Sequence, residues 1–272
     1  MPAQRALIFD IDGTLVAAGG RPTPATVSAI TQCRDLGHAC FVATARRPAS
    51  ARSVLGELAW LVDSGAFHAG ALGQCRVSAW QDATTLPGPL VDAVISLAER
   101  LVPHATISIH SAAGHAAFGP VVPSEAVLRG WSVHSDELTP FAQARYASAC
   151  KLAVITRTGT LHALVDELGR RWPQELSALL VDGGSFVNIT HGGTSKAAMM
   201  GRLLQQRGRS WAQAIACGDD LSDAQLLGAA GYAVAIAGGH PATLAVADAV
   251  VAGPADSGVA HFLAREIPGV RL

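Results

Sequence analysis

Short, continuously apolar runs alternate with longer stretches of helical character along much of the chain. Residues 6–10 and 39–44 are two such runs. Between them, Thr23 and Pro24 form a favourable helix start, with Thr23 as the N-cap and Pro24 in the first turn. Runs that are apolar throughout are typical of parallel strands covered on both faces. The pattern therefore predicts an α/β core with a doubly wound, Rossmann-like parallel sheet.

The same alternation predicts the remaining elements of this core. Gly37 ends the first helix, and Pro48 begins a second one that is expected to run to about residue 58. We expect the other strands at residues 60–63, 213–217, 232–236 and 248–251.

The middle of the chain has a different pattern, which begins after the turn-forming sequence Leu-Pro-Gly-Pro at residues 86–89. Asp182-Gly183-Gly184 is a strong hairpin signal between two short strands. The region predicts an inserted α+β module with an open antiparallel sheet. We expect the core to comprise residues 1–84 and 191–272, with the insert at 85–190. Its expected elements are helices 90–101 and 161–172, and strands 106–110, 115–118, 151–156, 178–181 and 185–190.

Composition narrows the possible partners and locations. Of the 272 residues, 15% are charged, and the formal net charge of −1 leaves no basic surplus for nucleic acid or an anionic membrane. The first apolar run breaks at Asp10, which is too early for a signal peptide, and no run of about 18 apolar residues could cross a bilayer. The five cysteines are scattered and form no C-x-x-C pair. We expect a cytoplasmic protein, monomeric or homodimeric, with no nucleic-acid or membrane partner.

Polar residues gather where the predicted strands end. Asp10 and Asp12 follow the first strand, Thr44 ends the second, and Asp219 and Asp223 follow the strand at 213–217. The carboxyl ends of parallel strands share one rim of the sheet, where α/β proteins place their ligands. We therefore expect these side chains to converge.

The types of residue at this rim point to phosphoryl transfer. Crowded carboxylates need a cation, and oxygen ligands suit Mg²⁺. A phosphate dianion needs a hydroxyl such as Thr44, a helix N-terminus and an ammonium, which Lys196 supplies. With a carboxylate nucleophile added, the set suits transfer through an aspartyl-phosphate.

Four ordered segments resemble the motifs of the haloacid dehalogenase (HAD) superfamily. They are Asp-Ile-Asp-Gly-Thr at 10–14, Thr-Ala-Arg at 44–46, Lys196, and Gly-Asp-Asp-Leu-Ser-Asp at 218–223. The insert lies between the second and third motifs, which resembles the C2-capped branch called Cof-type, or class IIB, phosphatases. The resemblance extends over essentially the whole chain.

The resemblance implies a role for each matching residue. Asp10 would be the nucleophile, and Asp12 would protonate the leaving alkoxide and then deprotonate water. Thr44, Ala45 and Lys196 would bind the phosphoryl oxygens. A halide leaves without a proton, so the presence of Asp12 separates this chain from the true dehalogenases.

The resemblance also implies a metal site. Asp10, the backbone carbonyl of Asp12, and Asp219 would hold Mg²⁺. Asp223 would support them through metal-bound water or Lys196.

Two positions are expected to contact substrate, and two others depart from the family pattern. Arg46 follows the phosphate-binding Thr44, and Asn188 lies on the last strand of the insert, where related phosphomannomutases carry an Asp that contacts sugar hydroxyls. Ala45 replaces the usual Gly, which is tolerable if its φ is negative. Ser222 replaces the usual Asn in the fourth motif.

The sequence thus indicates a Mg²⁺-dependent phosphatase acting on a small phosphorylated metabolite, with a sugar phosphate as the first choice. A phosphomutase of the same capped type is an alternative. So is a phosphatase acting on pyridoxal phosphate or flavin mononucleotide. A binding protein that has lost turnover is a third alternative, supported only by Ala45 and Ser222.

Overall fold

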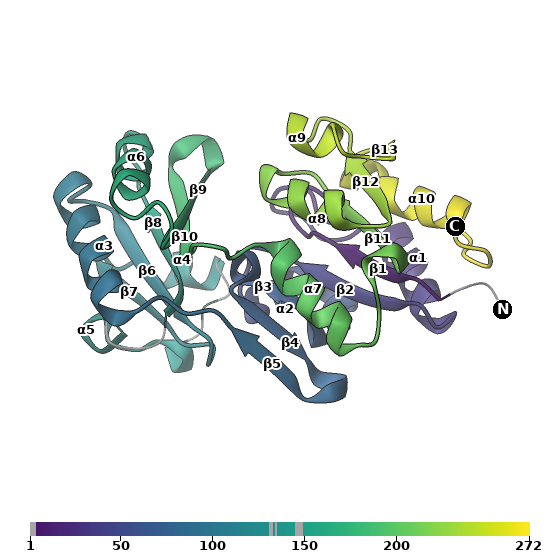
Figure 1. The fold of residues 1–272 in the computed structure, drawn as a ribbon, viewed down its shortest axis with the longest axis horizontal. Coiled ribbons are helices and arrows are strands. Elements are labelled where there is room, and N and C mark those ends of the chain that lie inside the picture. Colours follow the sequence, from purple (N-terminus) through teal and green to yellow (C-terminus); the bar gives the residue numbers. More distant parts are fainter. Residues whose placement is uncertain (1–3, 131–132, 134, 145–148) are drawn as a thin grey trace. The chain divides into compact units, whose positions relative to one another are not determined.

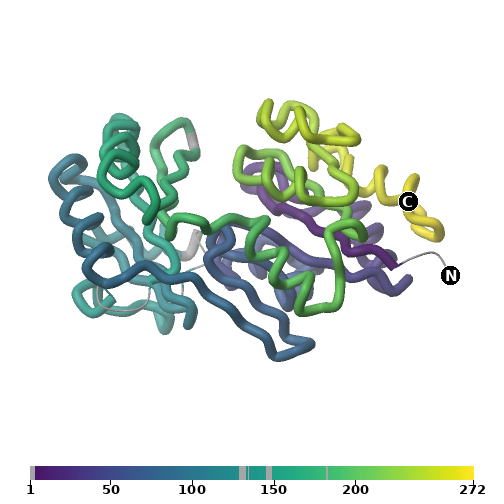
Figure 2. Tube along the Cα trace, viewed as in Figure 1, coloured from purple at the N-terminus to yellow at the C-terminus, as the bar shows by residue number. Residues whose placement is uncertain are grey.

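The chain folds into two compact units, one inserted within the other. The computed structural model describes residues 4–130, 133, 135–144 and 149–272. One unit comprises Met1–Asp82 and Ser195–Leu272, and the other comprises Ala83–Thr194. Figure 2 traces the chain out of the first unit in blue and back into it in green.

An eight-stranded sheet forms the centre of the first unit, in the order β13-β12-β11-β1-β2-β3-β4-β5 (Figure 1). The strands from β13 to β3 are parallel, and β4 runs antiparallel to β3. The predicted parallel core is therefore confirmed. The strands are β1 (Ala6–Phe9), β2 (Ala39–Ala43), β3 (Ser64–Phe67), β4 (Leu72–Cys75), β5 (Trp80–Ala83), β11 (Ala214–Gly218), β12 (Tyr232–Ile236) and β13 (Ala249–Val251).

Helices cover both faces of this sheet, as expected for a doubly wound fold. Successive residues of a strand point to opposite faces. Ala6 and Ile8 of β1 share a buried cluster with Met199 and Leu203 of α7, while α1 and α10 pack together on the other face. The helices are α1 (Pro24–Asp35), α2 (Pro48–Leu55), α7 (Lys196–Gln206), α8 (Ala224–Ala229), α9 (Pro241–Leu244) and α10 (Gly258–Glu266).

The predicted strand at residues 60–63 is wrong. Gly56–Asp63 forms a 3₁₀ helix, and the strand β3 begins only at Ser64. Leu58, Leu61 and Val62 are fully buried, with the three- and four-residue spacing of one helical face. A short apolar run does not distinguish this arrangement from a buried strand.

The sequence patterns also miss the strands β4 and β5, which extend the sheet beyond β3. Each has only four residues, and their sequences, LGQC and WQDA, carry little strand signal. The chain enters β4 through His68, Ala69 and Gly70, whose φ values of 53°, 57° and 95° are all left-handed. Such a turn is unusual for two non-glycine residues, so turn composition does not reveal it.

The inserted unit is an α+β module, as predicted. Its antiparallel sheet has the order β7-β6-β8-β10-β9, and α3 and α6 pack on one face of it. The predicted hairpin at Asp182–Gly184 joins β9 and β10. The strands are β6 (Thr106–Ser111), β7 (Ala116–Pro120), β8 (Ala149–Ile155), β9 (Leu176–Val181) and β10 (Phe186–His191). The helices are α3 (Gly88–Leu101), α4 (Glu125–Gly130), α5 (Phe141–Ala144) and α6 (His162–Arg171).

Within the described ranges, no helix combines the length and the apolar character needed to cross a membrane. The longest helix in those ranges, α3, has 14 residues.

We expect Gly70→Ala to destabilise the first unit strongly. A Cβ at Gly70 would collide with the carbonyl oxygen of Ser195, which is the N-cap of α7. Gly19 is a matched control, because its φ is also left-handed, at 68°, but a Cβ there meets nothing within 4 Å. Gly19→Ala should cost about 1 kcal/mol and Gly70→Ala more than about 2 kcal/mol, because the second adds a clash to backbone strain. Chemical denaturation of both variants measures the difference, and equal costs would contradict the predicted clash.

Candidate active site

Three neighbouring strands deliver polar residues to one rim of the core sheet. Asp10 follows β1, and its backbone N–H donates to the carbonyl of Cys217 on β11 at 2.9 Å. Thr44 follows β2, and its N–H donates to the carbonyl of Ala66 on β3 at 2.8 Å. Asp219 follows β11 directly. Parallel pairing therefore places residues that are far apart in the sequence at the same end of the sheet.

A buried lysine joins two of the carboxylates. Lys196 Nζ donates to Oδ1 of Asp10 and to Oδ1 of Asp223, each at 2.7 Å. The side chains of Lys196, Asp10 and Asp223 are only 3%, 5% and 0% exposed. Burial opposes the lysine's charge, but the two carboxylates outweigh it and raise the pKa of Lys196. The ammonium therefore stays charged at the rim.

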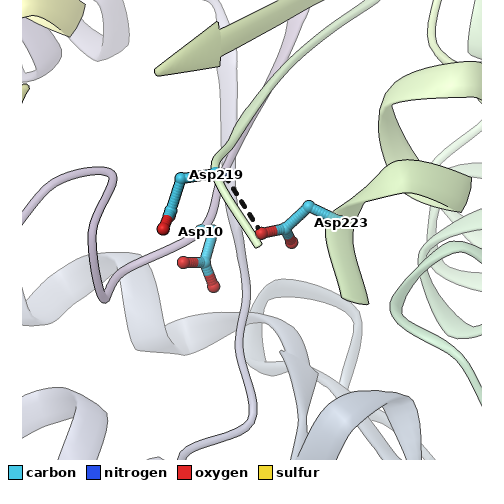
Figure 3. Close-up of side chains that lie close together, drawn as sticks. All are labelled: Asp10, Asp219 and Asp223. Atoms are coloured by element: carbon cyan, nitrogen blue, oxygen red, sulfur yellow. Dashed lines mark hydrogen bonds between the residues drawn. The ribbon is translucent and has the colours of Figure 1, made fainter. Parts of the chain in front are cut away.

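Asp219 completes a group of three carboxylates (Figure 3). Thr14 Oγ1 donates to Oδ1 of Asp219 at 2.7 Å. Asp223 lies beside it, because Oδ2 of Asp223 accepts from the backbone N–H of Asp219 at 3.2 Å. A Cβ at Gly13 would collide with the Asp219 carboxylate, so the absence of a side chain at Gly13 leaves room for that carboxylate.

The three carboxylates form a site that fits a cation. One oxygen from each of Asp10, Asp219 and Asp223 lies within 4.8 Å of the others. Burial, opposed by Lys196 and reinforced by the neighbouring aspartates, raises the pKa of Asp10 well above its ordinary value. Burial also raises the pKa of Asp219 to about 6, against the hydrogen bond from Thr14. A single ammonium does not balance three carboxylates, and oxygen ligands of this kind suit Mg²⁺.

Asp12 does not join this group through its side chain. Its carboxylate accepts from Arg46, with Nε–Oδ2 and Nη2–Oδ1 distances of 2.7 Å each. Arg46 Nη1 also donates to Ser50 Oγ at 2.9 Å. The hydrogen bonds to Asp12 raise the pKa of Arg46. The two aspartates of the first motif therefore have different partners, Lys196 for Asp10 and Arg46 for Asp12.

The loop after β2 is held by the Thr44 side chain and by hydrogen bonds from the backbone of His68 and Ala69. Thr44 Oγ1 accepts from the N–H of Arg46 at 3.1 Å, and the carbonyl of Thr44 accepts from the N–H of Ala69 at 3.1 Å. The carbonyl of Arg46 accepts from the N–H of His68 at 3.0 Å. Ala45 does not have a positive φ, so its methyl group fits where relatives carry glycine.

Thr14, the last residue of the first motif, lies 205 positions from Asp219, to which it donates. Two further contacts of the site have no signal in the sequence. Ser50 lies on α2, a full turn beyond Arg46. Thr243 Oγ1 donates to the backbone carbonyl of Asp219 at 3.1 Å. Hydroxyl side chains are common on any helix or loop, so their spacing alone could not identify them.

Asn188 lies in the inserted unit, on β10, and is only 5% exposed. Its register aligns it with Ala153, which pairs in turn with Ser108. Asn188 and Ser108 therefore share a sheet face, the one opposite α3 and α6. Among the described residues, Oδ1 of Asn188 has no hydrogen-bond partner.

Comparison with known proteins agrees with the motifs. The family model described as haloacid dehalogenase-like hydrolase matches residues 7–263. No curated protein gives a significant sequence match.

Several solved structures share the fold of the whole chain. A haloacid dehalogenase-like hydrolase from Bacteroides thetaiotaomicron has a TM-score of 0.82 at 18% identity, covering 97% of this chain and 99% of that one. A sugar phosphatase of HAD subclass IIB has a TM-score of 0.80 at 21% identity, covering 96% and 98%. A phosphatase of the HAD superfamily, also from Bacteroides thetaiotaomicron, has a TM-score of 0.74 at 20% identity, covering 96% and 94%.

These likenesses show a common architecture, in which a parallel core sheet is interrupted by an antiparallel α+β insert. The family match extends from the strand that precedes Asp10 to the last helix of the core. The chain therefore belongs to the haloacid dehalogenase-like hydrolases, as the order of its four motifs predicts.

Proposed function

We propose that this protein is a Mg²⁺-dependent phosphatase that hydrolyses a small phosphorylated metabolite, with a sugar phosphate as its first candidate substrate. The observation that carries the proposal is the close group of Asp10, Lys196, Asp219 and Asp223, which lies where β1 and β11 end and in which all but Asp219 are buried. It combines a nucleophile, an ammonium and a cation site in one place. These are the parts that phosphoryl transfer needs.

Asp10 would act as the nucleophile. A carboxylate oxygen of Asp10 attacks phosphorus, and the bond from phosphorus to the ester oxygen breaks, which gives an aspartyl-phosphate and an alkoxide. Lys196 and Thr44, together with backbone N–H groups around Ala45, would bind the phosphoryl oxygens during transfer. Lys196 already contacts Asp10, so its charge lies where negative charge develops.

Asp12 would carry the proton in both halves of the reaction. It first donates a proton to the departing alkoxide, which becomes the free alcohol. Ionised Asp12 then takes a proton from water as the water attacks the aspartyl-phosphate, and inorganic phosphate leaves with Asp10 restored. The side chain of Asp12 is 54% exposed, so water can reach it.

Asp10, Asp219 and the backbone carbonyl of Asp12 would hold Mg²⁺, with Asp223 in support. The bound cation would neutralise the crowded carboxylates and the phosphate charge. The site is supported by the closeness of the Asp10, Asp219 and Asp223 carboxylate oxygens, which lie within 4.8 Å of one another. Burial and the neighbouring aspartates raise the pKa values of Asp10 and Asp219, so a cation would favour their ionised forms.

We infer that the inserted unit is the cap that selects substrate. The sequence predicts its limits as residues 85–190. Asn188 would contact substrate hydroxyls from the cap, because its buried Oδ1 has no hydrogen-bond partner among the described residues. A buried polar atom in this state is costly unless a ligand or water supplies the missing bond.

We expect Asp10→Asn to fold normally and to lose turnover by at least about 1,000-fold, because an amide cannot attack phosphorus as a carboxylate does. Asp35→Asn is the matched control, since Asp35 lies on the surface of α1 in an exposed ion pair with Arg34. Release of p-nitrophenolate from p-nitrophenyl phosphate with Mg²⁺ measures both. Wild-type turnover by Asp10→Asn would refute the proposed mechanism.

We expect the effect of Asp12→Ala to depend on the leaving group. An alkoxide needs a proton as it leaves, whereas p-nitrophenolate is stable without one. The loss of kcat/KM, which covers the steps up to departure of the leaving group, should therefore be about 100-fold or more on a hexose phosphate and at least several-fold smaller on p-nitrophenyl phosphate. Equal losses on the two substrates would show that Asp12 is not the acid.

We expect Asp219→Asn to stabilise the cation-free protein at pH 8. The pKa of Asp219 is raised to about 6 in the folded state, so its ionisation costs stability as the pH rises from about 4 through 6. Removing the charge should recover about 1–3 kcal/mol, given about 1.4 kcal/mol for each pKa unit.

The same variant should lose the rise in Tm that Mg²⁺ produces in the wild type. In the wild type, that rise should weaken as the pH falls below about 6, because protonated Asp219 no longer binds the cation. Asp220→Asn is the matched control, since Asp220 caps the next 3₁₀ helix and asparagine caps equally well. Thermal unfolding with EDTA or Mg²⁺ measures all three proteins, and an unchanged response of Asp219→Asn to Mg²⁺ would contradict the assigned site.

A further inference from the structure

The ion pair between Arg46 and Asp12 has the geometry of a two-pronged fork. Both oxygens of Asp12 accept from the guanidinium, each at 2.7 Å. Such bidentate pairs fix orientation as well as charge. Among the described residues, both hydrogen bonds to the Asp12 carboxylate come from Arg46.

Arg46 is held independently of Asp12. Its Nη1 donates to Ser50 Oγ at 2.9 Å, and Ser50 is buried on α2. Its backbone N–H donates to Thr44 Oγ1, and its carbonyl accepts from the N–H of His68. The guanidinium is therefore held by Ser50 as well as by Asp12, and the Arg46 backbone is held in the loop that carries the phosphate-binding Thr44.

The backbone of Asp12 is fixed in a similar way. The N–H groups of Leu15 and Val16 both donate to the carbonyl of Ile11 at 2.9 Å, and Gly13 has a φ of 83°. The side chain of Asp12 is 54% exposed, and its two hydrogen bonds within the described part of the chain both come from Arg46.

We propose that Arg46 is a positioning residue for Asp12. It fixes the carboxylate that moves the proton, and it ties that carboxylate to the phosphate-binding loop. The proposal rests on the proposed function, in which Asp12 is the acid and base. It differs from a direct contact between Arg46 and substrate, which the sequence suggests.

The two roles predict different kinetics. A residue that acts through Asp12 affects kcat, because a misplaced acid slows proton transfer without weakening substrate binding. A residue that holds substrate raises KM. We expect Arg46→Met to lower kcat on a hexose phosphate by about 10-fold, with KM changed by no more than about twofold. On p-nitrophenyl phosphate the loss should be smaller, because its leaving group needs no acid.

The deciding experiment is a double-mutant cycle with Asp12→Ala, measured by phosphate release from a hexose phosphate with Mg²⁺, on which the effect of Arg46→Met is expected to be largest. If Arg46 acts through Asp12, Arg46→Met should change kcat by less than about twofold once Asp12 is absent. Arg46→Lys should recover only part of the wild-type rate, since an ammonium cannot form the fork. Thermal unfolding of the wild type, Arg46→Met, Asp12→Ala and the double variant gives a readout that does not depend on activity. The effects of Arg46→Met and Asp12→Ala on Tm should be non-additive.

Arg52→Met is the matched control. Arg52 lies on α2, six residues beyond Arg46, and pairs with Asp63 at 2.9 Å near the surface. Its loss should leave kcat and KM unchanged on both substrates.

Two results would overturn the positioning role while leaving the phosphatase intact. One is an equal loss from Arg46→Met with and without Asp12, and the other is a rise in KM alone. Both would show that Arg46 contacts substrate directly. If Asp10→Asn retained wild-type turnover, the proposed function itself would fail, and the role of Arg46 with it.

Discussion

The buried contact of Lys196 with Asp10 and Asp223 is the interaction on which the rest of this site depends. Removing two carboxylates and an ammonium from water is costly, and the two buried carboxylates depend on the ammonium between them. The contact joins the start of α7 to the end of β1 and to the 3₁₀ helix Leu221–Asp223, so it fixes a helix to the sheet as well as neutralising charge. Loss of Lys196 would leave both carboxylates buried without a counter-charge, whereas loss of Asp10 alone would leave Lys196 still paired with Asp223.

The remaining negative charge follows from this arrangement. Lys196 balances only part of the charge of the three carboxylates, and burial, reinforced by the neighbouring aspartates, raises the pKa values of Asp10 and Asp219. The rim of the core sheet therefore carries excess negative charge. A cation would neutralise this charge, so the same repulsion that opposes folding would favour the proposed metal binding.

Much of the fold is readable from the chain because apolar runs and helix starts are local signals. Residues 232–236 were expected as a strand and form β12, and Thr23 caps α1 as expected. The region around residue 60 was misread because a buried helical face and a buried strand are both apolar over four residues. The strands β4 and β5 follow the left-handed turn at His68 and Ala69, which the residue types there do not indicate.

The candidate site, too, was predictable only in part. Asp10, Lys196 and Asp219 lie in the motifs, because the chemistry restricts which residue types can occupy those positions. The fork from Arg46 to Asp12 could not be predicted, since arginine is equally suited to a substrate phosphate. It depends on where the loop after β2 is held, which only the folded backbone decides.

The close approach of Gly70 to Ser195 has a consequence for how the insertion is tolerated. Ser195 is the first residue of the returning core, and Lys196 follows it directly. Its Oγ caps α7 by accepting from Ala198 N–H at 3.1 Å, and its backbone lies against Gly70. The chain is thus held in place at the point where it re-enters the core. Changes in the length or sequence of the preceding insert would therefore leave the position of Lys196 in the core unchanged, so the insert can diverge without disturbing the site in the core.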